Sequence, residues 1–364
     1  MRFYVDCNEL ISAVLSVIKA LPLRTTLPAL EGIYVVAERE GVRLLCSDLM
    51  MQKECFIPAT VEEEGSCVVP GKLFSELIRK MPDSILELNM QSTVLVISGG
   101  RTRNQLQCIE FDEFPIMSFS GDHISVKMDR LDFKNMINQT SFAIATDDSK
   151  PMLTGAFTEF DGNRITMVAT DSYQLALKHI EVNEELPQKS TIIPGKTVNE
   201  LGRMMDETQD DVNLLLSKTH IRLDLGHTAL VARLLDGNYI DYKRLLPKES
   251  KTKVSINREE LINSIERAQL VAKEGNNNIL MSFEGDKLTI TAESFIGSIN
   301  DEIEVKLIGE DIKIAFNPKF CLNILKCIPD ETVYFEFNSS ISPCVIRPVR
   351  GESYYYLIVP MRIY

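Results

Sequence analysis

Hydrophobic and polar positions along the chain repeat one order of helix and strand patterns three times. Apolar residues recur at helical spacing over residues 5–21, 128–144 and 256–272, and a polar residue that can cap a helix precedes each stretch. Strand-like alternation follows each of them, in "GIYVVAEREGVRLLCSD", "GAFTEFDGNRITMVATD" and "ILMSFEGDKLTITAES". We therefore expect an amphipathic helix and then a strand pair in each repeat, with turns at Glu-Arg-Glu-Gly, Asp-Gly-Asn and Glu-Gly-Asp.

A second helical segment also recurs three times, as "VVPGKLFSELIRKM" (68–81), "IIPGKTVNELGRMM" (192–205) and "NPKFCLNILKCIPD" (317–330). The predicted apolar stripes consist of Leu73, Phe74, Leu77, Ile78 and Met81, then Val198, Leu201 and Met205, then Phe320, Ile324, Leu325 and Ile328. The opposite polar faces carry Lys72, Glu76 and Arg79, then Lys196, Glu200 and Arg203, then Lys319, Asn323 and Lys326. A β-rich stretch broken by short polar turns follows each copy, which predicts antiparallel meanders.

The repeats predict an α+β protein of three tandem domains, each with two helices against antiparallel sheets. Each copy spans about 120 residues, which exceeds solenoid repeats and is large enough for a hydrophobic core of its own. Apolar periodicity lapses near residues 118–126 and 247–255 of the 364-residue chain. The predicted domains are residues 1–121 (N-terminal), 122–247 (central) and 248–364 (C-terminal).

Composition disfavours several classes of protein. The eight cysteines form no C-x-x-C pair and the four histidines no H-x-x-x-H spacing, so we expect no disulfide framework, zinc site or other metal site. No apolar run approaches the ~18 residues of a membrane span, and the start of the chain lacks the features of a signal peptide. We expect a cytoplasmic protein without a membrane partner.

No catalytic constellation stands out, and no cofactor site is expected. The sequence Gly195-Lys196-Thr197 resembles the end of a phosphate-binding loop, but position 190 is Ser where that motif needs glycine. No Ser/His/Asp or Cys/His set is evident, and the acidic runs at 62–64 and 209–211 are typical of solvated turns.

The charge of the repeated helix contrasts with that of the whole chain. Net charge is −13, which by itself disfavours wide contact with a polyanion. A basic residue nevertheless recurs at both outer positions of the polar face in all three copies of the helix. Common descent of the repeats, with lysine and arginine only solvating an exposed helix face, would explain one basic stripe. The retention of basic residues in all three copies of an acidic protein favours an anionic surface that faces all three domains.

Together with this repeat, "RTTLPALEG" (24–32), "ATDSYQLA" (169–176), "DGNYIDYKRLLP" (236–247) and the terminal "VPMR" (359–362) resemble the bacterial DNA polymerase III β subunit family, the sliding clamps. The resemblance covers the whole chain. It implies three clamp domains in each subunit and two subunits that close head-to-tail into a ring-forming homodimer. The helices of such a ring line a hole that surrounds double-stranded DNA of any base sequence. It also implies a non-catalytic processivity subunit that tethers the replicative polymerase.

By position in the family, DNA-facing residues are expected at Arg24, Lys72, Arg79, Lys196 and Arg203, with Lys319 and Lys326 added by the internal repeat. The family's subunit contact corresponds here to Arg101, Arg103, Leu106, Leu270, Val271, Asp301, Glu302 and Glu304. This chain has Asn104 where the family usually has an aromatic residue, so Leu106, Leu270 and Val271 are the apolar candidates for the seam.

The end of the chain, "YYYLIVPMRIY", has two interpretations. It can be a buried final strand, or Pro360 can stop the ladder and leave Met361 and Ile363 as exposed apolar residues of a partner site. In the family this end borders a groove that binds short linear motifs of polymerases, the clamp loader and repair proteins. The matching positions are Leu153, Thr170, Leu175, Ile240, Arg244, Leu245, Ile341, Pro343, Leu357, Ile358, Val359, Pro360, Met361 and Arg362. Ser172, Tyr173 and Gln174 replace the family's common Gly-His-Arg, and Tyr364 extends the usual end, so an altered groove specificity is expected.

Two other classes of protein remain as alternatives from the residues alone. One is a nucleotidyltransferase or nuclease that uses some of the 52 carboxylates, which a metal-binding carboxylate cluster would reveal. The other is a monomeric interaction scaffold built from repeats, which a measurement of mass in solution would distinguish from a dimer.

Overall fold

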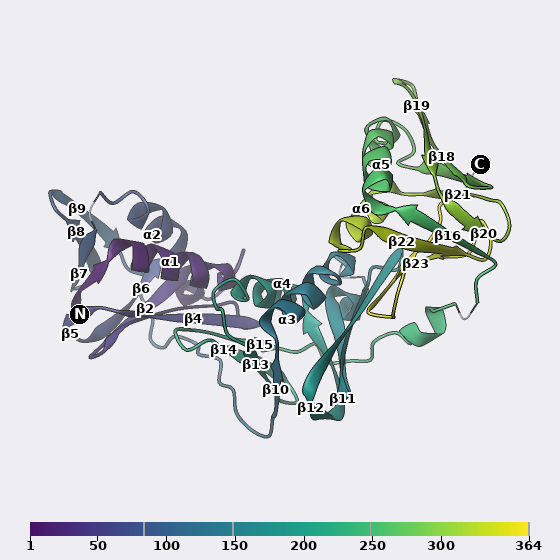
Figure 1. Ribbon diagram of the computed structural model, residues 1–364. Coiled ribbons are helices and arrows are strands. Elements are labelled where there is room, and N and C mark those ends of the chain that lie inside the picture. The colour runs from purple at the N-terminus through teal and green to yellow at the C-terminus, as the bar shows by residue number, and fades with distance from the viewer. Residues whose placement is uncertain (83, 148, 248, 363–364) are drawn as a thin grey trace. The chain divides into compact units, whose positions relative to one another are not determined.

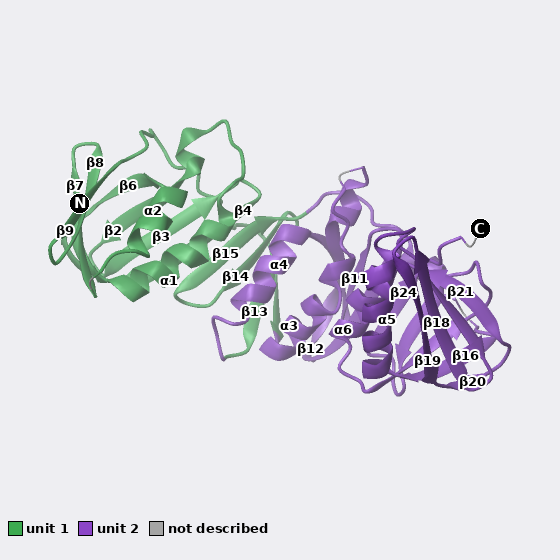
Figure 2. Cartoon of the chain, turned by 90° about the horizontal axis from the view of Figure 1, so that it is seen from above, with its two compact units in different colours: residues 1–127, 210–234 green, residues 128–209, 235–364 purple. Residues whose placement is uncertain are grey.

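The computed structural model describes residues 1–82, 84–147, 149–247 and 249–362 (Figure 1). The apolar Ile363 and the additional Tyr364 therefore lie outside the described residues. Contacts divide the chain into two compact units, residues 1–127 with 210–234 and residues 128–209 with 235–364 (Figure 2). Each unit is built from helices packed on antiparallel sheets.

The described residues of the first unit form two sheets and two α-helices. Its five-stranded sheet has the order β5-β1-β7-β8-β9, and its eight-stranded sheet the order β10-β13-β14-β15-β4-β3-β2-β6. The helices are α1 (Cys7–Val17) and α2 (Gly71–Ile78). The strands are β1 (Arg2–Asp6), β2 (Gly32–Glu38), β3 (Gly41–Ser47), β4 (Met51–Pro58), β5 (Thr60–Glu63), β6 (Gly65–Pro70), β7 (Ile85–Gln91), β8 (Val94–Gly99), β9 (Thr102–Gln107), β10 (Ile124–Met128), β13 (Val212–Leu216), β14 (His220–Asp224) and β15 (Thr228–Arg233).

The second unit has a seven-stranded sheet of order β11-β12-β24-β23-β22-β16-β20 and a four-stranded sheet of order β19-β18-β17-β21. Its helices are α3 (Arg130–Asn138), α4 (Gly195–Met204), α5 (Arg258–Ala272) and α6 (Pro318–Cys327). Its strands are β11 (Gly155–Thr170), β12 (Gln174–Pro194), β16 (Thr252–Asn257), β17 (Ile279–Glu284), β18 (Lys287–Ser294), β19 (Gly297–Glu304), β20 (Lys306–Ile308), β21 (Ile312–Phe316), β22 (Thr332–Phe337), β23 (Cys344–Pro348) and β24 (Tyr354–Ile358).

Two strand pairings join segments that the sequence assigns to different domains. Strand β15 pairs with β4, so the meander that follows α4 continues the sheet of the first repeat. Strand β12 pairs with β24 from Gln174 opposite Ile358 to Lys178 opposite Tyr354, and one buried cluster contains apolar residues from both repeats. Continuous sheets of this kind leave fewer unpaired strand edges than three separate domains would have.

The predicted helices form where capping and burial favour them. Asp6, Asp129 and Asn257 cap α1, α3 and α5 by accepting hydrogen bonds from main-chain N–H groups of the first turn. The repeated helices α2 and α4 have no such cap and begin instead at Pro70-Gly71 and Pro194-Gly195.

A close approach explains the glycine of the repeated Pro-Gly-Lys. A Cβ atom added at Gly195 would lie 2.9 Å from both the Cγ2 of Ile144 and the main-chain oxygen of Thr154. At Gly71 it would lie 3.2 Å from both methyl carbons of Leu21. The glycine therefore lets the start of each helix pack directly on the preceding connection, which a side chain would hold away.

The structure corrects three predictions from the pattern. Leu73, placed on the apolar stripe, is 53% exposed because the eight-residue α2 buries Phe74 and Ile78 and turns Leu73 outward beside Lys72. Glu200, placed on the polar face, is 2% exposed. The turn expected at 161–163 is a register shift within the pairing of β11 with β12, where Gly162 adopts a φ of 59° and both strands continue (Figure 1).

Among the helices of the described segments, none combines the length and the apolar character needed to cross a membrane.

Candidate partner groove, basic helix faces and sheet edges

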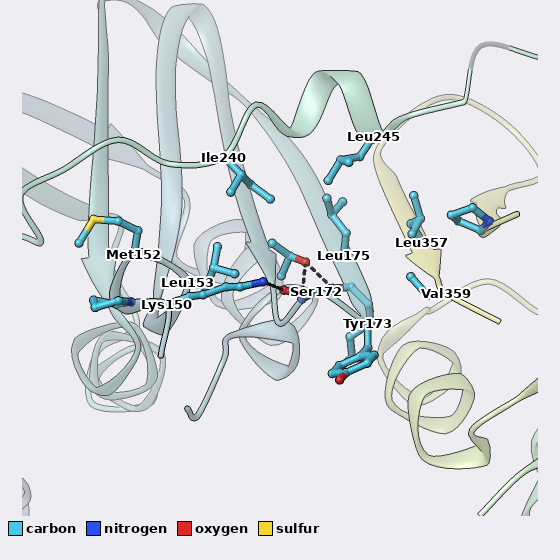
Figure 3. A pocket seen from close by; sticks show the side chains of 14 residues that line it. Lys150, Met152, Leu153, Ser172, Tyr173, Leu175, Ile240, Leu245, Leu357 and Val359 are labelled. Atoms are coloured by element: carbon cyan, nitrogen blue, oxygen red, sulfur yellow. Dashed lines mark hydrogen bonds between the residues drawn. The ribbon is translucent and has the colours of Figure 1, made fainter. Parts of the chain in front are cut away.

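A cavity of about 450 Å³ lies in the second unit, between the end of β11, the start of β12 and the chain that leaves β24 (Figure 3). Its lining is predominantly apolar. It consists of Lys150, Pro151, Met152, Leu153, Thr170, Ser172, Tyr173, Gln174, Leu175, Ile240, Leu245, Pro343, Leu357 and Val359. We call this cavity the groove. A mostly apolar concavity with a few placed polar groups is the usual form of a ligand or peptide site.

The turn between β11 and β12 forms one side of the groove and is held by its own side chains. The hydroxyl of Thr170 donates to the main-chain oxygen of Gln174 (2.7 Å) and accepts from the N–H of Ser172 (3.2 Å). The carboxylate of Asp171 accepts from the N–H groups of Tyr173 and Gln174, both at 2.9 Å. These local bonds give the turn one conformation, as Asx and Ser/Thr motifs commonly do.

The chain after β24 is joined to this turn. The N–H of Val359 donates to the main-chain oxygen of Tyr173 (2.9 Å), and the N–H of Met361 donates to the oxygen of Ala315 in β21 (2.8 Å). The ring of Tyr173 stacks on that of Phe320 at the start of α6, with centroids 6.0 Å apart. Strand β24 thus ends at Ile358, and main-chain bonds attach Val359 to the turn beside the groove and Met361 to β21.

The opposite side of the groove comes from the segment 239–245. The Tyr239 ring stacks on Phe157 (5.1 Å, 9°), and the Tyr242 hydroxyl donates to the Glu159 carboxylate, so Ile240 between them has a fixed position. Burial, together with this carboxylate, raises the pKa of Tyr242, so the phenol keeps its proton and remains a donor.

The structure brings together eight of the fourteen residues expected in the groove: Leu153, Thr170, Leu175, Ile240, Leu245, Pro343, Leu357 and Val359. The other six do not line it. Ile358 is buried in the core, Ile341 and Arg244 are exposed, Met361 bridges to β21, and Pro360 and Arg362 follow the groove wall.

Sequence reasoning did not include six of the lining residues. Ser172, Tyr173 and Gln174 belong to the "ATDSYQLA" motif, where their departure from the family pattern predicts an altered groove specificity without placing them in the lining. Pro151 and Met152 lie with Leu153 in the short 3-10 turn Pro151–Thr154, and Lys150 immediately precedes this turn; no periodicity in the sequence indicates these three residues. Their proximity to a motif residue was the only available signal.

All seven residues expected to face DNA are exposed: Arg24, Lys72, Arg79, Lys196, Arg203, Lys319 and Lys326. Arg203 and Lys326 form ion pairs within the second unit. Arg203 donates to the buried carboxylate of Glu200 (2.9 Å), and Lys326 contacts Glu266 of α5 (2.7 Å). Glu200, at the acidic position of the repeated motif in α4, is thus a buried partner of Arg203 and not a solvent-exposed carboxylate.

The charged residues expected at a subunit contact lie on or next to two strands that end their sheets. Arg101 precedes β9, the last strand of the five-stranded sheet, and Arg103 is exposed on it. Asp301, Glu302 and Glu304 lie on β19, the first strand of the four-stranded sheet.

Only part of the expected acidic set is available to a partner. Asp301 already accepts from the guanidinium of Arg267 (2.6 and 2.7 Å) and from the Ser264 hydroxyl (3.0 Å). Glu302 pairs with Lys287 (2.5 Å), and Glu304 is exposed.

The apolar candidates for this contact differ in exposure. Leu270, in the last turn of α5, is 68% exposed, whereas Val271 and Leu106 are buried. Asn104 of β9 contacts the sulfur of Met81 through its amide nitrogen (3.3 Å). Leu270 is therefore the apolar residue of this set that remains open to a partner.

Three family models together match nearly the whole chain. They are the N-terminal domain of the DNA polymerase III beta subunit over residues 1–118, its central domain over residues 127–241 and its C-terminal domain over residues 243–362. The chain is 33% identical to the beta sliding clamp of Bacillus subtilis (strain 168), with 100% of both chains covered.

Solved structures agree over the full length. The DNA polymerase sliding clamp from Bacillus subtilis matches with a TM-score of 0.94 at 32% identity, covering 100% of both chains. The DNA polymerase III beta subunit from Thermotoga maritima matches with a TM-score of 0.93 at 30% identity, also with 100% of both chains covered.

Proposed function

The chain belongs to the DNA polymerase III beta subunit family, and we propose that two copies of it close into a ring that surrounds duplex DNA and binds partner proteins in the groove. It is built of three tandem clamp domains. We propose residues 1–121, 122–247 and 248–364 as the bounds of these domains. The members of this family are sliding clamps, and the function of the chain is to tether the DNA polymerase for processive replication without catalysing synthesis itself.

The observation that carries the ring proposal is the position of β9 and β19. An end strand offers unpaired N–H and C=O groups to another strand. Of the eight strands that end the four described sheets, β9 in the first unit and β19 in the second carry the charged residues expected at the subunit contact. A contact between two different surfaces is heterologous, and it closes into a ring if the rotation between subunits allows it.

Charge supports β9 against β19 as the pairing. Arg101 and Arg103 are exposed at β9, and Glu304 is exposed on β19 beside Glu302, which is exposed but also pairs with Lys287. In the dimer, these charges of opposite sign would set the register, while Leu270 would be covered by the partner subunit.

The seven exposed basic residues support a sequence-independent DNA surface. Lysine and arginine side chains that contact phosphates bind any sequence and make affinity depend on salt. Because a ring is held on DNA by its topology, a modest number of such contacts suffices, and an acidic chain with a net charge of −13 is compatible with the function. Because strong contacts to the DNA are few, the ring can also slide along it.

The groove supports docking of short linear segments. Its walls are apolar side chains held by main-chain bonds, which is the arrangement that gives a few anchors most of the binding energy. Replicative polymerases, the clamp loader and repair proteins are the proposed partners, because they must reach the same DNA that the ring encircles.

Release from DNA ends tests the ring directly. The protein is loaded with a clamp loader on a nicked circular plasmid, separated from free protein by gel filtration, and the plasmid is then cut at one site. We expect release after cutting, and retention when tightly bound blocks occupy both ends. Equal retention on circular and unblocked linear DNA would refute topological binding.

A further inference from the structure

We propose that the turn Phe295–Ile296 of one subunit packs on Leu73 in helix α2 of the other, in a strand register that the internal repeats of the chain define. This inference rests on the proposed ring and specifies the contact between β9 of one subunit and β19 of the other, which we call the seam. It follows from two strand pairings inside the chain that join one repeat to the next.

One isolated main-chain bridge marks the same point in each repeat. The three bridges join Val68 to Ile109, Ile192 to Leu235, and Ala315 to Met361. The first residue of each bridge lies three positions before the first residue of α2, α4 or α6. The second residues of the bridges are therefore equivalent, and so are the strands that precede them, β9, β15 and β24.

Strand β24 shows how the last strand of one repeat joins the repeat before it. It pairs with β12 of the central repeat, and Ile358 lies opposite Gln174. The next residue, Val359, donates its N–H to the oxygen of Tyr173 (2.9 Å) in the two-residue turn 172–173 that precedes β12.

Strand β15 repeats this arrangement in the other unit. It pairs with β4 of the first repeat, and Ala232 lies opposite Met51. The next residue, Arg233, donates its N–H to the oxygen of Met50 (2.8 Å) in the two-residue turn 49–50 that precedes β4. The same register thus holds at both places where one repeat joins the next, in two separate sheets.

Strand β9 belongs to the first repeat, which has no repeat before it in the chain, so its neighbour can only come from a second copy. The N–H of Cys108 bonds the oxygen of Thr93 within the sheet (2.9 Å), so the N–H of Gln107, one residue earlier, points to the open edge. The equivalent of β4 and β12 in the last repeat is β19, which also follows a two-residue turn, because Ser294 lies opposite Gly297.

Transfer of the internal register to the seam fixes which residues meet. Gln107 precedes the bridge residue Ile109 by two positions, as Val359 precedes Met361. Its N–H therefore donates to the oxygen of Ile296 of the partner subunit. Counted back along β9, residues 106 to 102 then lie opposite residues 297 to 301 of β19.

The charges of the two strands fit this register. It places Arg101 opposite Glu302 and diagonal to Glu304, and it places Arg103 diagonal to Glu302. All four side chains fall on the same face of the joined sheet, because side chains alternate along a strand. Pairs of opposite charge at these positions stabilise neighbouring strands.

The other face of the two strands gives an independent check. Asn104, which lies opposite Ile299 in this register, contacts the sulfur of Met81 just beyond α2 (3.3 Å). Ile299 packs on the core cluster that includes the buried residues of α5. Both side chains thus face the helices of their own units, as two neighbours in one sheet should. A shift by one residue would turn one of them to the opposite face.

The same equivalence assigns a partner to the exposed leucine of α2. Phe320, the third residue of α6, stacks on Tyr173 in the turn of the preceding repeat, with centroids 6.0 Å apart. Leu73 is the third residue of α2 and is 53% exposed, and Ile296, the equivalent of Tyr173, is 57% exposed. Contact between Leu73 and Ile296 at the seam removes apolar surface of both subunits from water.

The first test is a double-mutant cycle on the dimer. Sedimentation velocity over a dilution series gives the dimer Kd of the wild type, Leu73→Ser, Ile296→Ser and the double variant. We expect each single change to raise Kd about a hundredfold, roughly tenfold at each of the two seams of the ring. The double variant should raise Kd by less than the product of the two, because the residues share one contact. Ile308→Ser, which removes another exposed isoleucine from β20, is the control and should leave Kd unchanged.

The second test traps the register with cysteines. Gln105→Cys with Ser298→Cys joins residues opposite each other in the proposed register, where Cα atoms lie about 5.5 Å apart and a disulfide can form. Gln105→Cys with Asn300→Cys is the matched diagonal pair, at about 7–8 Å. All three positions are exposed. After oxidation with copper phenanthroline, non-reducing electrophoresis should show covalent dimers for the first pair and few for the second.

The outcomes separate this inference from the ring itself. Equal or stronger cross-linking of the 105–300 pair would overturn the register. An unchanged dimer Kd in both serine variants, or fully multiplicative effects in the double variant, would overturn the contact between Leu73 and the turn. In each of these cases the wild type remains a dimer. A monomeric wild type would instead refute the proposed ring.

Discussion

Removal of residues 359–364 is expected to weaken the binding of partner peptides and to leave the dimer intact. The truncation removes Val359, which lines the groove, and two main-chain bonds, from Val359 to Tyr173 and from Met361 to Ala315. It does not touch the fold of β24, which remains paired with β12 and β23.

The expected loss follows from these contacts. Val359 is 36% exposed, and full burial of a valine side chain contributes about 1.5–3 kcal/mol, so covering its open part contributes about 0.5–1 kcal/mol. Loss of the Val359–Tyr173 bond loosens the groove wall that the peptide must meet, at a cost of about 0.5–1.5 kcal/mol. The sum of about 1.0–2.5 kcal/mol corresponds to a roughly five- to seventyfold increase in Kd.

Two measurements on one variant decide the matter. Fluorescence polarisation with a polymerase-derived peptide reports Kd, and light scattering reports the mass in solution. Ile308→Ala is a suitable control, because Ile308 is exposed on β20 and lies outside the groove. It removes exposed apolar surface from the same unit and should leave Kd unchanged.

Each outcome has a defined meaning. Unchanged peptide affinity in the truncated protein would place the partner site elsewhere and refute the role of the terminal segment. A monomeric truncated protein would show that the segment is needed for the subunit contact, contrary to the assignment of that contact to β9 and β19.

Three further predictions concern charge and backbone strain. Lys72→Ala and Arg203→Ala should each lower the salt dependence of DNA association by about one or less in log–log slope. Only Arg203→Ala should also lower the free energy of unfolding, by about 1 kcal/mol in urea denaturation, because it removes the guanidinium that contacts the buried Glu200; equal stability of the two variants would contradict this. Ser172→Gly should raise the free energy of unfolding by about 1 kcal/mol by relieving the conformation at φ 79°, and an unchanged or lower melting temperature would argue against strain. Burial lowers the pKa of His179 below its ordinary 6.5, so the unfolded state takes up the proton first as pH falls through 6.5, and the free energy of unfolding declines. His179→Gln should make that decline shallower. An identical dependence of the free energy of unfolding on pH in the variant would exclude His179 as a cause.

Local sequence was sufficient for the order of elements. Each predicted helix forms, because the cap at Asp6, Asp129 or Asn257 and the apolar spacing depend only on residues a few positions apart. The threefold repeat and the meanders follow from the same short-range patterns. The function was predicted from the family resemblance, and the full-length matches to sliding clamps confirm that prediction.

Side-chain exposure within those elements needed the tertiary structure. Helical spacing places Leu73 on one face with Phe74 and Ile78, but it does not indicate how much of that face the sheet will cover. The short helix α2 buries Phe74 and Ile78 and leaves Leu73 exposed. Likewise, residues 161–163 have the composition of a turn. Because β11 stays paired with the long β12 on both sides of them, they form a register shift within a continuous strand.

The groove was decided almost wholly by contacts between distant segments. Its walls come from residues 150–175, 240–245, 343 and 357–359, which β12–β24 pairing and the Val359–Tyr173 bond bring together. Sequence by itself determined which of these stretches are apolar and where strands stop. Within the groove, the Lys150 ammonium donates to the hydroxyl of Ser172, which lies 22 positions further along the chain and has a φ of 79°. Such a pairing depends on the three-dimensional path of the backbone, for which no periodicity in the sequence gives a signal.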